Sequence, residues 1–242
     1  MIRLLRKEIQ VFFSSLIAYL VIFVFLILNT LFLWVFPGEY NILDNGFASL
    51  DNFFILAPWV FLFLIPAVTM RSFSEELKNG TFELLATKPL TDGHIVIAKF
   101  LSTIFIVVLA TIPSFIYFFT VYQLGQTPGN IDVGAALGSY IGLIFLASAY
   151  SAIGVLCSSL TNNQIVSFIT TVFLCFVFYM GFDSIAGSFG PKTAYFVEQF
   201  GINAHYISLS RGLIDLKDVV YFITLETIVL SLCILKLQSR KW

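Results

Sequence analysis

Few residues of this sequence could carry out chemistry, and one of them is expected inside a long apolar segment. Glu226 lies in the run 219–237, and we predict that it is the only acidic or basic side chain inside any such run. A carboxylate at that depth can belong to a pathway or gate, or it can accept a hydrogen bond from Ser, Thr or Tyr on a neighbouring helix. Both interpretations stay open, so Glu226 is a candidate pathway residue.

Nucleophiles, metal ligands and nucleotide-binding loops give no second candidate. Cys157, Cys175 and Cys233 are far apart in the sequence and are expected to be packing residues. His94 and His205 are predicted on opposite sides of a bilayer, where they cannot share a metal. No Gly-rich loop ends in Gly-Lys-Ser or Gly-Lys-Thr. We therefore predict no catalytic residue, no cofactor and no metal; if ATP drives the protein, the ATPase is a separate chain.

The composition indicates the class of protein to which these residues belong. Of the 242 residues, 59% are hydrophobic and 11% are charged, whereas soluble domains carry about 25% charged residues. A water-soluble domain and a disordered chain are therefore excluded. The 13 basic and 14 acidic residues give a net charge of -1, so no bulk attraction to nucleic acid is expected.

Apolar runs long enough to cross a membrane occupy about half of the chain. A spanning helix needs about 20 predominantly apolar residues. We therefore predict an all-α membrane protein with six transmembrane helices in one domain, residues 1–242. Pro58, Pro66 and Pro113 should bend the second and third spans. The predicted spans are residues 16–36, 53–69, 95–122, 135–156, 165–182 and 219–237.

The distribution of basic residues predicts the orientation of these spans. Lys and Arg near the ends of spans are retained on the cytoplasmic side. Ten of the 13 basic residues belong to the termini and the even-numbered loops, which places both termini in the cytoplasm. These ten are Arg3, Arg6, Lys7, Arg71, Lys78, Lys88, Lys99, Lys236, Arg240 and Lys241.

The longest cytoplasmic connection, residues 71–94, is predicted to form short helices. Ser72 with Glu75 three residues later fits a capping box, and Gly80 should end that first turn. Thr81 can cap a second short helix, which Pro89 stops, and Thr91 with Asp92 is expected to begin the third span. Apolar and acidic residues alternate along the connection. This pattern favours a docking surface for a partner over a hairpin that only joins two spans.

The same connection resembles a known family. Glu75-Glu76, Gly80-Thr81, Glu83-Leu84-Leu85, Pro89 and Lys99 are similar to the segment between the second and third spans of ABC-2 type permeases, the membrane subunits of one class of ABC transporters. In that family the segment is the coupling helix, which sits in a cleft of a separate ATPase. The resemblance implies that the docking residues are Phe73, Glu75, Glu76, Leu77, Gly80, Thr81, Glu83, Leu84 and Leu85.

Two further stretches extend the resemblance. Residues 2–9 resemble the family's amphipathic helix on the cytoplasmic face, where basic residues lie near lipid headgroups. Residues 208–222 are similar to the gliding-motility-associated subgroup of the family. Residues 194–209 correspond to its pair of short helices that dip into the outer leaflet.

The resemblance also implies partners and a location. It implies a permease subunit in the bacterial inner membrane, with a separate ATPase dimer, membrane lipids and a second permease subunit that is identical or related. Alternatives from other classes are an ATPase-independent secondary carrier or channel, and a structural component of a motility machine. The scarcity of ionisable groups inside spans counts against the carrier.

A stripe of small residues predicts one close helix contact. Gly134, Gly138 and Gly142 recur every fourth residue at the start of the fourth span. This spacing lets two helices approach closely. Such a stripe can join helices within one subunit or join two subunits, and the sequence leaves both uses open.

Overall fold

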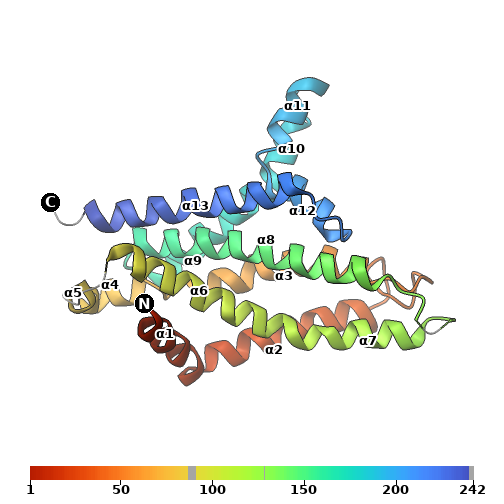
Figure 1. Ribbon diagram of the computed structural model, residues 1–242, viewed down its shortest axis with the longest axis horizontal. Helices are drawn as coiled ribbons and strands as arrows, with labels where there is room; N and C mark the ends of the chain where they lie inside the picture. Colours follow the sequence, from red (N-terminus) through yellow and green to blue (C-terminus); the bar gives the residue numbers. More distant parts are fainter. Residues whose placement is uncertain (87–90, 128, 240–242) are drawn as a thin grey trace.

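The computed structural model describes residues 1–86, 91–127 and 129–239. Throughout these ranges the chain is built of helices and turns, with no strand (Figure 1). Six helical segments are long and apolar enough to cross a membrane, and each predicted run coincides with one of them. The six segments are Leu16–Val35, Asp51–Lys78, Asp92–Leu124, Val133–Leu160, Gln164–Ala186 and Leu216–Gln238.

Several of these segments are made of more than one element. The elements of the six segments are α2 (Leu16–Thr30) with η1 (Leu31–Val35), α3 (Asp51–Thr69) continuing into α4 (Ser74–Lys78), α6 (Asp92–Thr111) with η2 (Ile112–Ser114) and α7 (Phe115–Leu124), α8 (Val133–Leu160), α9 (Gln164–Phe176) with η3 (Val177–Gly181) and α10 (Phe182–Ala186), and α13 (Leu216–Gln238). The remaining helices are α1 (Ile2–Ser14), α5 (Thr81–Ala86), α11 (Pro191–Glu198) and α12 (Ile202–Ser210).

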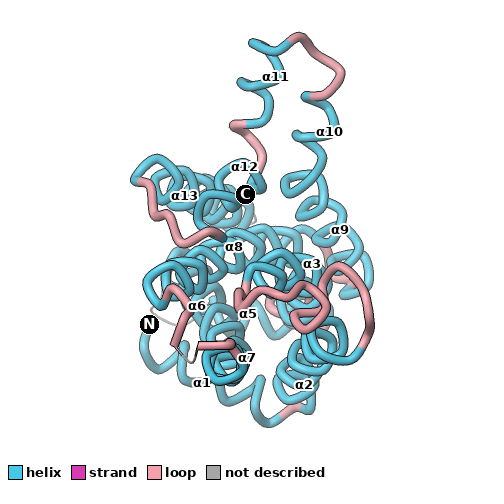
Figure 2. The backbone as a smooth tube through the Cα atoms, turned by 90° about the vertical axis from the view of Figure 1, so that its right-hand side faces the viewer, coloured by secondary structure: helices cyan, strands magenta, loops and turns pink. Residues whose placement is uncertain are grey.

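Helix α8 is the centre of the bundle. It packs against α3, α6, α9, α12 and α13, and Figure 2, which looks along the helices, shows it surrounded by them. In its most apolar window 78% of the residues are buried, compared with 22% in α9 and in α13. Small residues such as Ala147, Ala149 and Gly154 let the neighbouring helices come close. The core of the molecule is therefore built around α8.

The prolines act differently in the two helices that contain them. Pro113 lies in η2, a single 3-10 turn that separates α6 from α7. Proline removes a backbone donor and disfavours an uninterrupted α-helix, so the predicted break in the third span is found at this turn. Pro58 and Pro66 lie inside α3, which runs through both without interruption.

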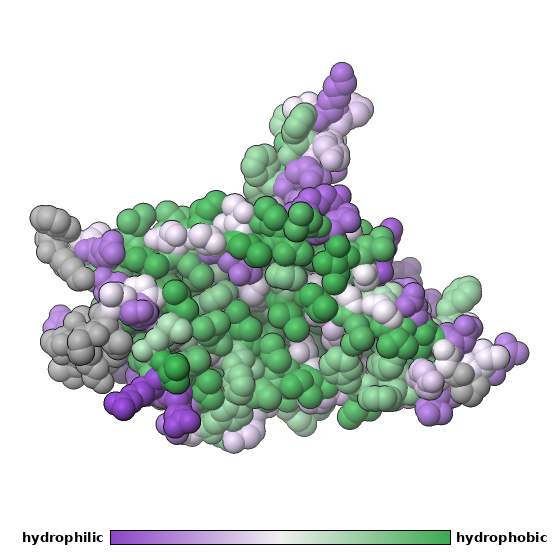
Figure 3. All heavy atoms as spheres, viewed as in Figure 1, coloured by the Kyte–Doolittle hydropathy of each residue, from purple (hydrophilic) through white to green (hydrophobic). Residues whose placement is uncertain are grey.

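The surface of the bundle is apolar between its two ends. The face seen in Figure 3 is largely hydrophobic there, with hydrophilic residues gathered at the ends and on the projecting α10 and α11. Large exposed side chains include Phe23 on α2 and Phe173 on α9. An apolar surface of this extent is what a lipid-facing bundle requires.

One end of the bundle carries the first helix and the last turns of the last helix. Helix α1, the C-terminal end of α13, and helices α4 and α5 all lie there (Figure 1). We call it the α4 end, and we call the opposite end the α12 end. The predicted pair of short helices between the fifth and sixth spans is present as α11 and α12. Tyr206 and Leu209 of α12 are buried, whereas α11 buries no residue.

Candidate functional site

The predicted docking segment forms two short helices at the α4 end. Helix α4 ends at Lys78, and Gly80 follows with φ +68. That conformation is strained for residues with a side chain, so the expectation that Gly80 ends the first turn is confirmed. The hydroxyl of Thr81 donates to the backbone oxygen of Glu76 at 3.4 Å. This bond ties the start of α5 back to α4.

The start of α4 is held by a side chain from another helix. The Ser158 hydroxyl of α8 accepts from the backbone N–H groups of Phe73 at 2.8 Å and Ser74 at 3.1 Å. Ser74 also donates to the Ser158 carbonyl at 3.1 Å. The predicted capping box of Ser72 and Glu75 is therefore wrong, because α4 begins at Ser74 without a side-chain cap of its own. Ser158 satisfies its first amides instead.

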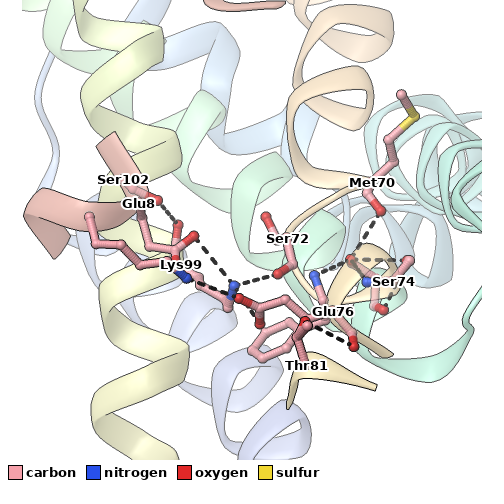
Figure 4. Close-up of polar contacts among 11 residues, drawn as sticks. Glu8, Met70, Ser72, Ser74, Glu76, Thr81, Lys99 and Ser102 are labelled. Atoms are coloured by element: carbon pink, nitrogen blue, oxygen red, sulfur yellow. Dashed lines mark hydrogen bonds and ion pairs between the residues drawn. The ribbon is translucent and has the colours of Figure 1, made fainter. Parts of the chain in front are cut away.

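A buried lysine joins α4 to α1 and α6. The Lys99 ammonium of α6 lies 3.0 Å from an oxygen of Glu76 and 3.4 Å from an oxygen of Glu8 in α1. Figure 4 shows Lys99 between these two carboxylates, with its ammonium also donating to the Ser72 carbonyl. Lys7 completes the group at 3.2 Å from Glu8 and 3.4 Å from Glu76. We call these four residues the Lys99 network.

The Lys99 network is balanced in charge, with two cations and two carboxylates. Lys99 is 1% exposed, and a charge at that depth is tolerated only when it is paired. Burial lowers the pKa of Lys7, but the carboxylates of Glu8 and Glu76 outweigh it, so this pKa is raised above 10.5. Lys7 is therefore protonated at neutral pH. The prediction that Glu226 is the only charged residue inside a span is wrong, because Lys99 lies within α6.

The predicted docking residues divide into an inner and an outer set. Phe73 is fully buried, contacts the Phe82 ring at 6.0 Å, and has the Lys99 ammonium 5.0 Å from its own ring centre. Phe73 packs between the segment and the bundle and cannot form part of the segment's outer surface. Glu75, Glu76 and Leu77 are half-buried, and the exposed set is Gly80, Thr81 and Glu83. The side chains of Leu84 and Leu85, and Pro89, lie outside the described residues.

The outer set borders a hollow at the α4 end. A cavity of about 480 Å³ is lined by residues of α4 and α5 and by the last turns of α8 and α13. Leu77, Gly80 and Glu83 contribute to its lining, together with Lys236 of α13. The segment thus offers a concave surface of mixed charge beside its two short helices.

Glu226 pairs with a neighbouring helix. The Ser148 hydroxyl of α8 donates to a carboxylate oxygen of Glu226 in α13, and Glu226 itself is half-buried. This bond is the kind that the second interpretation requires, in which Glu226 accepts a hydrogen bond from Ser, Thr or Tyr on a neighbouring helix. Glu226 and Ser148 are both distant in sequence from the docking segment.

The glycine stripe packs within the chain. A Cβ added at Gly142 would lie 2.5 Å from Leu209 Cβ, and one added at Gly138 would lie 2.6 Å from the carbonyl oxygen of Gly212. Gly134 has only its own neighbour Asp132 nearby. Gly138 and Gly142 therefore let α8 approach α12 and the turn that follows it.

The two histidines lie at opposite ends of the bundle. His94 lies in the first turn of α6 at the α4 end, where the Thr91 side chain accepts from its backbone N–H at 3.3 Å and caps the helix as predicted. His205 of α12 lies 2.7 Å from Asp218 of α13 and 3.0 Å from the Gln199 carbonyl. Among the described residues, no group of three or more His, Cys, Asp or Glu is placed to hold a metal.

Three residues of the site were missed by sequence reasoning. Glu8, Lys99 and Ser158 hold the segment in place, yet from the sequence Lys99 stands out only as a basic residue near a span end and as one residue of the family resemblance. A lysine flanked by Ile95-Val96-Ile97-Ala98 and Phe100-Leu101 is a sign of a buried charge that needs partners. No comparable signal marks Ser158, which is one of many small residues in α8.

Comparison with known protein families gives a match over nearly the whole chain. A family model described as ABC-2 family transporter protein matches residues 3–237. No curated protein matches the chain. The matched range includes every element of the site.

Proposed function

The chain belongs to the ABC-2 transporter family, and from this premise we propose that it is a permease subunit whose α4–α5 segment docks onto a separate ATPase. Proteins of this family are multi-pass membrane components of transporters, are not themselves catalytic, and normally work with an ABC ATPase subunit. The chain's own contribution is then mechanical: it receives a movement at the α4 end and passes it to its spans.

One observation carries this proposal, namely that the segment is exposed on its outer side and fixed on its inner side. Glu83, Gly80 and Thr81 face outward, while Phe73 and Ser74 are buried beneath them. The inner side is attached to α8 through Ser158 and to α6 through Lys99. A force on the outer side therefore reaches two spans by direct polar contact. A plain connector would not need such attachments.

The same proposal includes the orientation of the chain in the membrane. We place the α4 end and both termini in the cytoplasm of a bacterial cell, and the protein in the inner membrane. The excess of Lys and Arg in the termini and even-numbered loops supports this placement. An ATPase that binds cytoplasmic ATP can reach the segment only in this orientation.

The biological setting is proposed from the similarity of residues 208–222 to the gliding-motility-associated subgroup. On that basis the chain pairs with a second, related permease subunit and an ATPase dimer in a system linked to gliding motility. A transporter of this class needs two membrane halves, so pairing with a second copy is the alternative. Size-exclusion chromatography with mass spectrometry of the complex from native membranes distinguishes the two.

Co-purification from native membranes in mild detergent tests the docking. We expect a stoichiometric ATPase to accompany the chain, and the double variant Lys78→Glu with Glu83→Lys to lose it, because both side chains are exposed on the segment. Lys192→Glu in α11 is the matched control and should keep the ATPase. Glu76 is unsuited to this test, since its replacement also breaks the Lys99 network.

Two outcomes would contradict the proposal. Repeated purification without any ATPase would favour the ATPase-independent carrier or channel. Unchanged co-purification of the double variant, with the protein still inserted in the membrane, would remove the docking role of the α4–α5 segment. Loss of transport with the ATPase still bound would be expected only from variants of the inner contacts.

A further inference from the structure

A second cavity lies at the α4 end and shares no lining residue with the first. It measures about 480 Å³, is open on one side and is bordered by α1, the bend at Ser15, the start of α2 and residues 71–81. This volume is within the range of about 300–1,000 Å³ typical of small-molecule sites. One wall is apolar, formed by Val11, Phe12 and Ile17, and the other is charged.

The charged wall contains one unpaired cation and one unpaired anion. Lys7, Lys99, Glu8 and Glu76 also line the cavity, but they neutralise one another within the Lys99 network. Arg71 and Glu75 line it as well, and within the described part of the chain the side chain of neither has a hydrogen bond or ion pair. A ligand that matches this wall carries a negative and a positive group of its own.

The apolar side of the cavity continues onto the surface of the first span. Leu16, Leu20 and Phe23 follow Ser15 on one face of α2 and are 83%, 57% and 63% exposed. This face starts at the rim of the cavity, where α2 would enter the bilayer. A molecule seated in the cavity could therefore keep a polar head against Arg71 and Glu75 while its apolar part lies along α2.

We infer that this cavity binds the headgroup of a zwitterionic phospholipid with a primary amine, phosphatidylethanolamine. The planar guanidinium of Arg71 would donate two hydrogen bonds to the phosphate. The ammonium of the ethanolamine would donate to the carboxylate of Glu75. The anionic headgroup of phosphatidylglycerol has no cation to pair with Glu75, and a choline headgroup carries no N–H donor.

The inference goes beyond the proposed function and does not depend on an ATPase. A lipid at this position would touch α1, α2 and the segment that contains α4, next to the Lys99 network. The lipid would thus bridge α1 and the segment that contains α4, which the Lys99 network already joins.

Native mass spectrometry of the purified full chain in detergent tests the inference. Phosphatidylethanolamine, phosphatidylglycerol and phosphatidylcholine are added separately, and we expect the first to be retained about tenfold more strongly than the others, as one charge-assisted contact would give. Arg71→Gln should weaken its binding about tenfold. Glu75→Gln should remove the preference over phosphatidylglycerol. Lys78→Gln, on the outer side of the segment, is the control and should change neither.

One further variant and two soluble competitors complete the test. Arg71→Lys retains the charge without the two-pronged geometry and should bind with intermediate strength, which guards against a misfolded Arg71→Gln variant. Inorganic phosphate and free phosphoethanolamine should not displace the lipid at equal concentration. Displacement by either would assign the cavity to a free phosphate compound and overturn the lipid assignment. Equal retention of phosphatidylglycerol by the unaltered chain, or unchanged binding by Arg71→Gln, would also overturn it.

Discussion

The two ends of the bundle each contain buried charged groups, but they connect different kinds of elements. At the α4 end, Lys99 pairs with Glu8, which is 91 residues away in sequence, and with Glu76 of the exposed segment. At the α12 end, His205 pairs with Asp218, which is 13 residues away, and both ring nitrogens of His205 have partners. The group at the α4 end thus joins a surface segment to distant helices, whereas the group at the α12 end braces two consecutive helices.

This difference leads to a functional distinction between the ends. A disturbance of the Lys99 network should change both the stability of the protein and its response to an ATPase. A disturbance of the His205–Asp218 pair should change stability alone. The stacking of Tyr221 on His205, with ring centres 3.9 Å apart, fits a rigid brace.

The largest effect is expected from Lys99→Met. This change leaves the buried Glu8 and the half-buried Glu76 with only the exposed Lys7 as a cation, and breaking a buried ion pair in this way costs about 3–5 kcal/mol. The thermal midpoint in detergent, followed by fluorescence-detected size exclusion, should fall by about 10 °C or more. Adding Glu8→Gln and Glu76→Gln to the same chain removes the orphaned charges and should restore most of the loss. A single variant as stable as the parent would show that the network is not ionic.

His205→Leu tests the other end. Asp218 is 1% exposed and would lose its hydrogen-bonded partner, so we expect a loss of about 3 kcal/mol in thermal unfolding. Asp218→Asn is the matched control with a milder effect, because an amide can donate to the imidazole. Co-purification of the ATPase should be unchanged in both variants. Loss of the ATPase from either variant would disprove the proposed functional distinction between the α4 end and the α12 end.

Gly142→Ala tests the packing that holds α12 onto α8. The added Cβ would lie 2.5 Å from Leu209 Cβ, and overpacking of this kind costs about 1–3 kcal/mol. Gly134→Ala meets only Asp132 Oδ1 at 3.3 Å and should be neutral or slightly stabilising. If the two alanines had equal effects on the thermal midpoint, the close contact between α8 and α12 would be disproved.

Ser158→Ala should loosen α4 without unfolding the bundle. The change removes the acceptor for the backbone N–H groups of Phe73 and Ser74, and loss of such a cap costs about 1 kcal/mol. Hydrogen exchange at residues 73–78 should become faster. Ser151→Ala, which removes a hydroxyl that donates only to the carbonyl of Ala147, is the control and should leave that exchange unaltered.

The smallest effect is expected from Lys7→Met. The Lys7 side chain is 53% exposed, and ion pairs of exposed lysines contribute about 0–1 kcal/mol. Because the folded pKa of Lys7 is raised, its contribution is fully present below pH 10.5 and is lost as the pH rises through the folded pKa. A stability difference between parent and variant that grew with pH between 6 and 9 would contradict this assignment.

The sequence predicted the elements of this molecule better than their contacts. Six spans followed from the length and hydropathy of apolar runs, and Gly80 and Thr91 from turn and cap chemistry, since these are local properties. The partners of Lys99 and the cap that Ser158 provides could not be predicted, because each joins residues far apart in the chain. The local pattern predicts Ser72 as the cap of α4, whereas in the structure the hydroxyl of the more distant Ser158 has that role.

Site-specific cross-linking identifies the surface of the chain that lies against the ATPase. Cys157, Cys175 and Cys233 are all buried, so Lys78→Cys on α4 and Lys192→Cys on α11 each introduce one accessible thiol. With a bifunctional thiol–amine reagent in native membranes, we predict an adduct with the ATPase from Lys78→Cys and none from Lys192→Cys. An ATPase adduct from Lys192→Cys, with none from Lys78→Cys, would contradict the account.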